Sequence, residues 1–257
     1  MQGLREVCAQ NVHERREAIK NKGDDHFDVL SLLIKSDDFS DAELIDQLLT
    51  VLAAGHETTS SALTWLCYLL AKHPDYQSRL RDEINEAFPI NPLQDPSIDI
   101  ASVLERLPLL NGVCNETLRL FPTVPITMRI AVRDTTLLDA PIPRGTEIMV
   151  SPWAVNRQRE LWGDDAEEFK PERWIEDGKP NNSGGADSNY SLLTFLHGPR
   201  SCIGQGFAKA ELRCLVAAFI KVFSWELDMK EDPVPAGVIT IKPEKGLHVK
   251  LNTVGKW

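Results

Sequence analysis

A long stretch near the start of the chain has the pattern of a single helix. Ser40 followed by Glu43 forms a capping box, which is a common helix start, and the stretch ends where His73 meets Pro74. Between these ends apolar residues recur at helical spacing: Leu44, Leu48, Leu52, Leu63, Leu66 and Leu70. At 1.5 Å per residue the helix would be ~45 Å long, enough to cross a whole domain. Its apolar character predicts that it is buried.

The middle of this stretch reads Ala54-Gly55-His56-Glu57-Thr58-Thr59. Glycine costs about 1 kcal/mol in a helix interior, and a threonine hydroxyl can bond back to the carbonyl four residues earlier. We therefore expect the helix to open locally. Gly55 would leave room for a small ligand, Thr58 would offer a hydroxyl and Glu57 a titratable group. A tolerated kink with a capped pair of threonines is the other interpretation.

A second informative segment, residues 195–204, reads F-L-H-G-P-R-S-C-I-G. Gly198 and Gly204 flank Cys202, and glycine lets a backbone turn tightly and approach a flat ligand. Arg200 and the start of the following helix favour the thiolate form, which is the form that binds metals. The remaining cysteines form no Cys-x-x-Cys pair, so one thiolate on a haem iron fits better than a zinc site. A reactive or merely buried cysteine in a turn is the simpler alternative.

A third segment, residues 107–121, is predicted to be a helix ended by Pro122. Glu116 and Arg119 stand three residues apart and share one side of it. On a surface such an ion pair contributes only ~0–1 kcal/mol. Here the apolar neighbours of the pair indicate burial instead.

Composition limits the class of protein. A chain of 257 residues with 42% hydrophobic residues has enough material for a core. The formal net charge of −10, with dispersed Lys and Arg, argues against nucleic-acid binding. Five irregularly spaced cysteines make no disulfide framework, which indicates a reducing compartment. No secretion signal and no run of ~20 apolar residues is seen, so we expect no membrane anchor and a cytoplasmic location.

Together these segments resemble the cytochrome P450 family. The haem-binding pattern FxxGxRxCxG is filled by Phe195, Gly198, Arg200, Cys202 and Gly204. The oxygen-groove pattern [AG]GxxTT, with an acid before the first threonine, is matched at Gly55, Glu57 and Thr58. Glu116 and Arg119 match the family's ExxR pair. The resemblance covers nearly all of this chain and about the C-terminal half of the family's domain.

The resemblance implies a mainly α fold with small β-sheets, the C-terminal portion of the P450 fold, as a single truncated domain over residues 1–257. Its parts would be peripheral helices at 1–39, the long helix at 40–73, the ExxR helix at 107–121, the haem-ligand loop at 195–204 and a further helix at 203–223. From the alternation of residues we expect strands at 127–136 and 137–142 that pair with each other, another at 147–151, and two joined by a turn at 238–241 and 247–251.

The resemblance also implies roles for individual residues. Haem b would be held by the Cys202 thiolate, Arg129 and Arg200 would contact its propionates, and Phe195, Gly198 and Gly204 would shape the loop. Arg173, from the segment 169–174, would complete a structural triad with Glu116 and Arg119. Glu57 and Thr58 would relay protons. The candidate lining of the substrate pocket is Val124, Ile126, Thr127, Val238 and Ile239.

The expected function is that of a haem-thiolate monooxygenase, which inserts one atom of dioxygen into a small apolar substrate. Because the chain has no GxGxxG loop, electrons would come from NADPH through a separate cytochrome P450 reductase, with cytochrome b5 as a further candidate donor. Lys209, Arg213 and Lys221 are candidate contacts for such a partner, although a solvated helix surface explains them equally well. Full-length relatives of eukaryotic type are anchored at the endoplasmic reticulum membrane.

Two other interpretations stay open. The missing N-terminal half would supply much of the pocket roof and another propionate contact, so the chain could be a non-catalytic fragment without stable haem. It could also be a haem-thiolate isomerase or dehydratase that acts on a peroxide. Glu57 and Thr58 argue against the latter, because such enzymes need no proton relay for dioxygen.

Overall fold

The computed structural model describes residues 2–22, 28–89, 92, 95 and 97–255. The chain forms two compact units, Met1–Glu57 and Thr58–Trp257, and each is described by itself. The prediction of a single domain over residues 1–257 stays a prediction.

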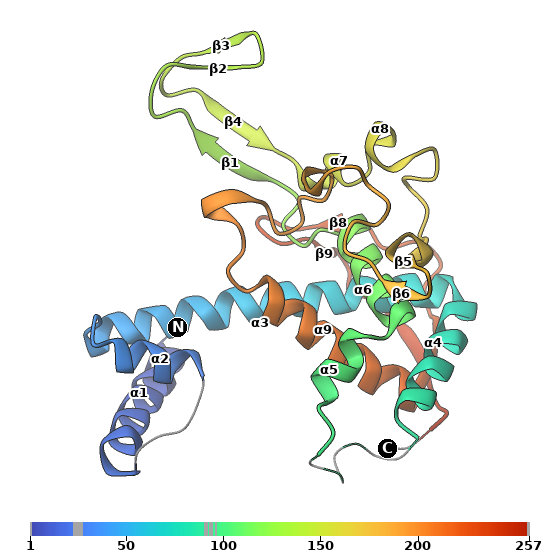
Figure 1. The fold of residues 1–257 in the computed structure, drawn as a ribbon, viewed down its shortest axis with the longest axis horizontal. Coiled ribbons are helices and arrows are strands. Elements are labelled where there is room, and N and C mark those ends of the chain that lie inside the picture. Colours follow the sequence, from blue (N-terminus) through green and yellow to red (C-terminus); the bar gives the residue numbers. More distant parts are fainter. Residues whose placement is uncertain (1, 23–27, 90–91, 93–94, 96, 256–257) are drawn as a thin grey trace. The chain divides into compact units, whose positions relative to one another are not determined.

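Helices make up about half of the described residues. In chain order they are α1 (Gln2–Lys22), α2 (Val29–Ser36), α3 (Asp41–Lys72), α4 (Pro74–Ala87), α5 (Ile100–Glu105), α6 (Pro108–Leu120), α7 (Pro152–Val155), α8 (Arg159–Trp162) and α9 (Gln205–Val222), as Figure 1 shows. Short 3-10 turns are η2 (Pro171–Trp174), η3 (Asn189–Ser191) and η4 (Gly198–Arg200). The helices predicted at 40–73, 107–121 and 203–223 correspond to α3, α6 and α9.

The strands form small two-stranded antiparallel sheets. They are β1 (Thr127–Ile130) with β4 (Glu147–Val150), β2 (Thr135–Leu137) with β3 (Ala140–Ile142), β5 (Ile175–Glu176) with β6 (Lys179–Pro180), β7 (Phe223–Leu227) with β10 (Val249–Thr253), and β8 (Pro235–Ala236) with β9 (Lys242–Pro243). The predicted fold class, mainly α with small β-sheets, is confirmed.

Two of the strand predictions are wrong. The strand expected over 127–136 is broken, because after β1 the backbone N–H of Ala131 still bonds to Thr146 O and the chain then turns into the separate β2–β3 hairpin. The strand predicted at 238–241 is not formed, and the one predicted at 247–251 corresponds to β10, which pairs with β7. Alternation of residue types marks strands but does not choose between distant partners.

The long helix α3 begins at the predicted capping box. The backbone N–H of Ser40 donates to Glu43 Oε2 at 2.8 Å, and the N–H of Glu43 donates to Ser40 Oγ at 3.4 Å. The helix then continues without a break through Gly55, so the predicted local opening is not seen. Burial is also limited to part of it: Trp65 is fully buried, whereas Leu52 is about half exposed.

Within the unit Met1–Glu57, α1, α2 and the first turns of α3 share a small apolar core. Its buried members are Val12, Ile34 and Leu44. Exposed ion pairs at 2.7 Å join α1 to α3, Arg5 with Asp46 and Arg16 with Asp41. Such pairs contribute little on a surface, so the apolar contacts carry most of the stability of this unit.

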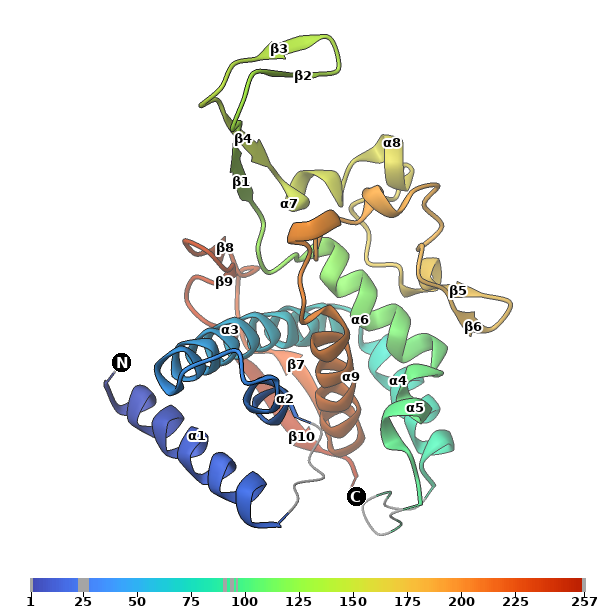
Figure 2. The same cartoon turned by 60° about the vertical axis from the view of Figure 1, so that its left-hand side comes forward.

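Within the unit Thr58–Trp257, the main core lies between the second half of α3, α4, α6 and α9. Its fully buried members include Leu66, Leu80, Leu110, Val113, Leu212 and Ile220. The views in Figures 1 and 2 agree that the β1–β4 and β2–β3 hairpins project away from these helices. In this core α6 is covered by the neighbouring helices. Its polar side chains must therefore find hydrogen-bond partners inside the protein.

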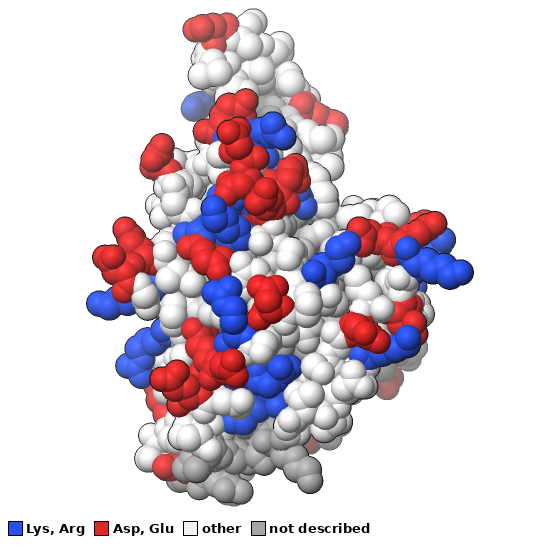
Figure 3. All heavy atoms as spheres, turned by 90° about the vertical axis from the view of Figure 1, so that its right-hand side faces the viewer, with Lys and Arg blue, Asp and Glu red and all other residues white. Residues whose placement is uncertain are grey.

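Surface charge is mixed on the face that Figure 3 shows, where acidic and basic side chains alternate without gathering into one basic patch. Among the described residues, no helix combines the length and the apolar character that crossing a membrane requires.

Candidate functional site

A fully buried carboxylate, Glu116 on α6, lies at the centre of a network of polar contacts. Its oxygens accept hydrogen bonds from Arg119 Nε and Nη2, both at 2.8 Å, and from Arg173 Nε at 3.3 Å. The indole N–H of Trp174 at 2.9 Å and the backbone N–H of Lys170 at 3.1 Å complete the set. The predicted triad of Glu116, Arg119 and Arg173 is thus brought together around one carboxylate.

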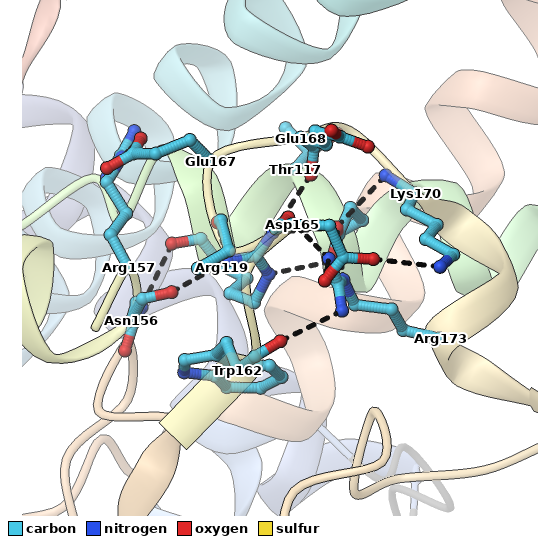
Figure 4. A network of polar contacts seen from close by, with 12 residues as sticks. Thr117, Arg119, Asn156, Arg157, Trp162, Asp165, Glu167, Glu168, Lys170 and Arg173 are labelled. Carbon is cyan, nitrogen blue, oxygen red and sulfur yellow. Dashed lines mark hydrogen bonds and ion pairs between the residues drawn. The ribbon is translucent and has the colours of Figure 1, made fainter. Parts of the chain in front are cut away.

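Arg119 uses every donor of its guanidinium, although its side chain is completely buried. Two N–H groups go to Glu116. The other three go to the backbone carbonyl oxygens of Asn156 at 2.8 Å, Ala166 at 2.6 Å and Glu168 at 3.1 Å. A buried guanidinium is tolerated only when it is paired and hydrogen-bonded in this way. These carbonyl partners come from the segment between α7 and η2, and Figure 4 shows Asn156 beside Arg119.

Asp165 extends the network on the side of Arg173. Its carboxylate contacts Arg173 Nη2 at 2.6 Å and Lys170 Nζ at 2.8 Å. The hydrogen bonds from Lys170 and Arg173 lower the pKa of Asp165 from 3.8 to about 2. Sequence reasoning missed Asp165 and Trp174, because neither residue type stands out in a segment rich in Asp, Glu and Trp.

The predicted ligand loop is a tight turn before α9. Leu196 and Gly198 have φ values of +58° and +78°, in the region that glycine adopts readily and leucine rarely does. The backbone N–H of Cys202 donates to Phe195 O at 2.8 Å, which closes the turn. His197 Nε2 donates to the carbonyl oxygens of Asn189 at 2.6 Å and Leu192 at 3.2 Å. This role of His197 was not predicted.

The cysteines differ in environment. Burial raises the pKa of the Cys67 and Cys114 thiols to about 12, so both stay protonated near neutral pH. Cys202 and Cys214 are exposed. Cys202 alone of these two lies on the glycine turn, and a β-carbon added at Gly204 would sit 3.9 Å from its sulfur. Among the described thiols, Cys202 is therefore the best placed to reach an external ligand.

The predicted propionate and pocket residues lie on exposed or half-buried backbone. Arg129 on β1 donates to Thr127 Oγ1 at 2.9 Å and to Met128 O at 2.8 Å, and Arg200 in η4 is exposed. Of the pocket candidates, Val124 and Thr127 are half-buried, whereas Ile126, Val238 and Ile239 are exposed. A hydrogen bond of 2.9 Å from Ile241 N–H to Thr123 O joins the two segments that carry these pocket candidates.

Glu57 and Thr58 are neighbours on α3 at the boundary of the two units. Glu57 is exposed and Thr58 is half-buried. The next residue, Thr59, is buried, and its hydroxyl has no hydrogen-bond partner among the described residues. Further along the helix, Ser61 Oγ and Trp65 Nε1 donate to Ile241 O, which fixes α3 to the segment after β8.

The cations predicted to meet a partner are less available than expected. Lys221 is buried and donates to Phe88 O at 2.7 Å, so the prediction that it faces a partner is wrong. Arg213 donates to Asn111 Oδ1 at 2.9 Å, and burial lowers the pKa of Lys209. These last two line a groove beside the ligand loop together with His197 and Gln205.

Comparison with known proteins identifies the protein family. The cytochrome P450 family model matches residues 1–250. The chain is 50% identical over 231 residues to the cytochrome P450 monooxygenase sphH of Aspergillus fumigatus, covering 90% of this chain and 42% of that protein. It is 45% identical over 254 residues to the cytochrome P450 monooxygenase ptmK of Penicillium ochrochloron, covering 98% and 49%. It is 39% identical over 208 residues to the cytokinin hydroxylase of Arabidopsis thaliana, covering 81% and 38%.

The chain therefore belongs to the cytochrome P450 family. It spans about half the length, or less, of these relatives. Membership of the family implies haem as the cofactor.

The residues present fit this group, which is a flat apolar ring with two carboxylates. Cys202 is an exposed residue, and Ile203 and Phe207, which follow it in sequence, are exposed apolar side chains. Arg129 and Arg200 offer exposed guanidinium groups that suit carboxylates.

Proposed function

We propose that this chain carries the haem-thiolate part of a P450 monooxygenase, which oxidises a small apolar substrate with dioxygen. The observation that supports this most directly is the turn around Cys202. Cys202 is exposed on a loop that its own N–H closes by a bond to Phe195 O, just before the helix α9. The buried triad of Glu116, Arg119 and Arg173 in the same unit gives that loop a rigid support.

Each candidate residue has one task in this proposal. Cys202 binds the iron through its sulfur. Arg129 and Arg200 bind the propionates, and Gly198 and Gly204 keep side chains away from the ring. Thr58 and Glu57 hold and pass on the protons that the reaction consumes. Val124, Ile126, Thr127, Val238 and Ile239 contact the substrate.

When bound, the haem supplies the activation of dioxygen, which amino-acid side chains cannot perform. Electrons are delivered from NADPH through a separate reductase, or through cytochrome b5. The groove lined by His197, Gln205 and Lys209 lies beside the ligand loop and is a candidate contact for that donor. The apolar character of the candidate pocket residues supports a lipophilic substrate.

The test is a pair of cysteine variants. Purified protein is titrated with haem, reduced under carbon monoxide and examined for the red-shifted Soret band that a thiolate ligand gives. Cys202→Ser removes the sulfur of the proposed ligand, and we expect the band to disappear. Cys214→Ser removes the other exposed thiol and should leave the band unchanged. An unchanged band in Cys202→Ser would mean that another residue is the ligand.

A second candidate function follows from length. The chain spans about half of the relatives it matches, and the second candidate is a P450 fragment that folds but does not hold haem. This candidate predicts that the wild-type protein itself gives no thiolate band. The chain is then co-expressed with the remaining part of a relative such as sphH. If the thiolate band appears, the chain can bind haem once the rest of the domain is supplied. If the band stays absent, the fragment candidate is supported.

A further inference from the structure

Asn156 is a completely buried residue at the end of α7, and all its polar side-chain atoms are used. Its Nδ2 group donates to Arg119 O at 3.1 Å and to Thr194 Oγ1 at 2.8 Å. Its Oδ1 accepts the backbone N–H of Leu193 at 2.8 Å. Its own carbonyl oxygen accepts from Arg119 Nη1. One carboxamide therefore joins α6 to the segment that leads into the ligand loop.

Thr194 makes the second connection. Its hydroxyl donates to Leu118 O at 2.8 Å while it accepts the hydrogen bond from Asn156. Leu118 and Arg119 are adjacent on α6, one turn or less from Glu116. Asn156 and Thr194 thus bond to two consecutive carbonyl groups near the C-terminal end of α6, where the helix leaves carbonyl oxygens without internal partners. Figure 4 shows Asn156 next to Arg119 in this network.

The same two residues hold the beginning of the turn that carries the sulfur. Leu193 and Thr194 come directly before Phe195, whose carbonyl oxygen accepts the N–H of Cys202. In Figure 2 the turn before α9 lies beside the C-terminal end of α6, in agreement with these bonds. A displacement at 193–194 would move Phe195 O and, with it, the hydrogen bond that closes the turn at Cys202.

We propose that Asn156 and Thr194 are positioning residues, which fix the ligand loop to the triad helix α6 and so set the position of Cys202. This role rests on the function proposed above in one respect, which is that Cys202 is the ligand of the haem iron. Neither residue contacts the sulfur. Both act through Phe195, and the buried triad supplies the rigid part to which they attach.

Isosteric substitutions separate this role from packing. Asn156→Asp keeps the shape and replaces the two N–H donors by an oxygen that faces Arg119 O and Thr194 Oγ1. Thr194→Val keeps the volume and removes the hydroxyl that links Asn156 to Leu118. Thr194→Ser keeps the hydroxyl and is the matched control, because it should retain both of these bonds.

The first measurement needs no haem. Amide hydrogen exchange is followed in the full chain for the N–H groups of Leu193 and Cys202 and, as an internal reference, for Leu80 and Ile84 in α4. We expect exchange at 193 and 202 to rise about tenfold in Asn156→Asp and Thr194→Val, with the α4 amides unchanged. Thr194→Ser should exchange like the wild type.

The second measurement is the Soret band of the haem complex under carbon monoxide. We expect the share of complex with thiolate ligation to fall in Asn156→Asp and Thr194→Val and to stay at the wild-type level in Thr194→Ser. If the wild type shows no thiolate band, either alone or on complementation with the remaining part of a relative, the proposed function fails, and the exchange measurement still decides the positioning role.

Three results would overturn the positioning role. The first is wild-type exchange at 193 and 202 in both Asn156→Asp and Thr194→Val. The second is equal exchange in Thr194→Val and Thr194→Ser. The third is a uniform rise that includes Leu80 and Ile84, because it would mean that the residues support the whole unit. If Asn156→Asp fails to fold, the comparison of the two Thr194 variants decides.

Discussion

At the scale of single residues, one buried carboxylate accepts more hydrogen bonds than any other group described above. Glu116 faces Arg119, Arg173, Trp174 and the amide of Lys170 with no exposure to solvent. Its charge is balanced only by these partners. A buried ion that loses its partner keeps its desolvation cost, so the network should respond sharply to a change of charge.

Glu116→Gln tests this directly. The amide keeps the shape but leaves the buried guanidinium of Arg119 without its counter-charge, and we expect the free energy of unfolding to fall by ~3–5 kcal/mol. Urea unfolding followed by circular dichroism measures it. Glu160→Gln, at an exposed position on α8, is the control and should change the value by less than ~0.5 kcal/mol. Equal effects of the two substitutions would contradict the central role of Glu116.

Asp165 gives a pH-dependent prediction. Its pKa is lowered to about 2 by hydrogen bonds from Lys170 and Arg173. A group with a lowered pKa in the folded state stabilises the protein above its ordinary pKa of about 4, and this contribution is lost as the pH falls toward 2. Asp165→Asn should therefore be less stable than the wild type at pH 6, and the difference should shrink between pH 4 and pH 2. Denaturant unfolding at each pH, with the exposed Asp164→Asn as control, would show it. A difference that does not vary with pH would argue against this ion pairing.

At the scale of elements, α6 and η2 approach so closely that only glycine fits between them. A β-carbon on Gly112 would lie 2.6 Å from the carbonyl oxygen of Pro171, which is part of the backbone and cannot rotate away. This close approach is what allows Arg173 and Trp174 of η2 to reach Glu116 on α6. The triad thus depends on a small residue that the ExxR pattern does not contain.

Gly112→Ala should separate the two elements. We expect a loss of ~1–3 kcal/mol in the free energy of unfolding, because overpacking forces a backbone shift. Gly206→Ala in the first turn of α9 is the control, since no atom lies within 4 Å of the added carbon and helices favour alanine. It should be neutral or stabilising by up to ~1 kcal/mol. Thermal unfolding of both variants would suffice, and a neutral Gly112→Ala would show that η2 can move.

At the scale of the whole molecule, many large apolar side chains are exposed. Val132, Leu138, Ile203 and Val238 are each more than 80% exposed. Surfaces of this kind usually meet a partner, a ligand or another part of the protein. The chain also spans about half the length of its relatives.

We therefore expect this chain, studied alone, to bind a hydrophobic dye and to self-associate. The net charge of −10 opposes association, so raising the salt concentration should strengthen it by screening the repulsion. Sedimentation velocity at several salt concentrations measures the effect. Leu138→Asp, at the tip of the β2–β3 hairpin, should reduce it. A monomer at every salt concentration would contradict the prediction.

The sequence by itself determined the features that depend on near neighbours. The start of α3 at Ser40, the helix that carries Glu116 and Arg119, and the glycine turn around Cys202 are all encoded within a few residues, where capping, periodicity and backbone freedom act. The family resemblance was also carried by such short patterns. Arg173 could be placed beside Glu116 only through that resemblance, because the chain between them is long.

Only the tertiary structure decided which distant groups meet. The pairing of β1 with β4 and of β7 with β10, the burial of Lys221, and the attachment of Asn156 and Thr194 to α6 depend on how the chain closes on itself. Hydrogen-bond partners far apart in sequence leave no periodic signal, since any asparagine or threonine can serve once the fold brings it to an unpaired carbonyl group. That is why the support of the ligand loop could not be read before the fold was known.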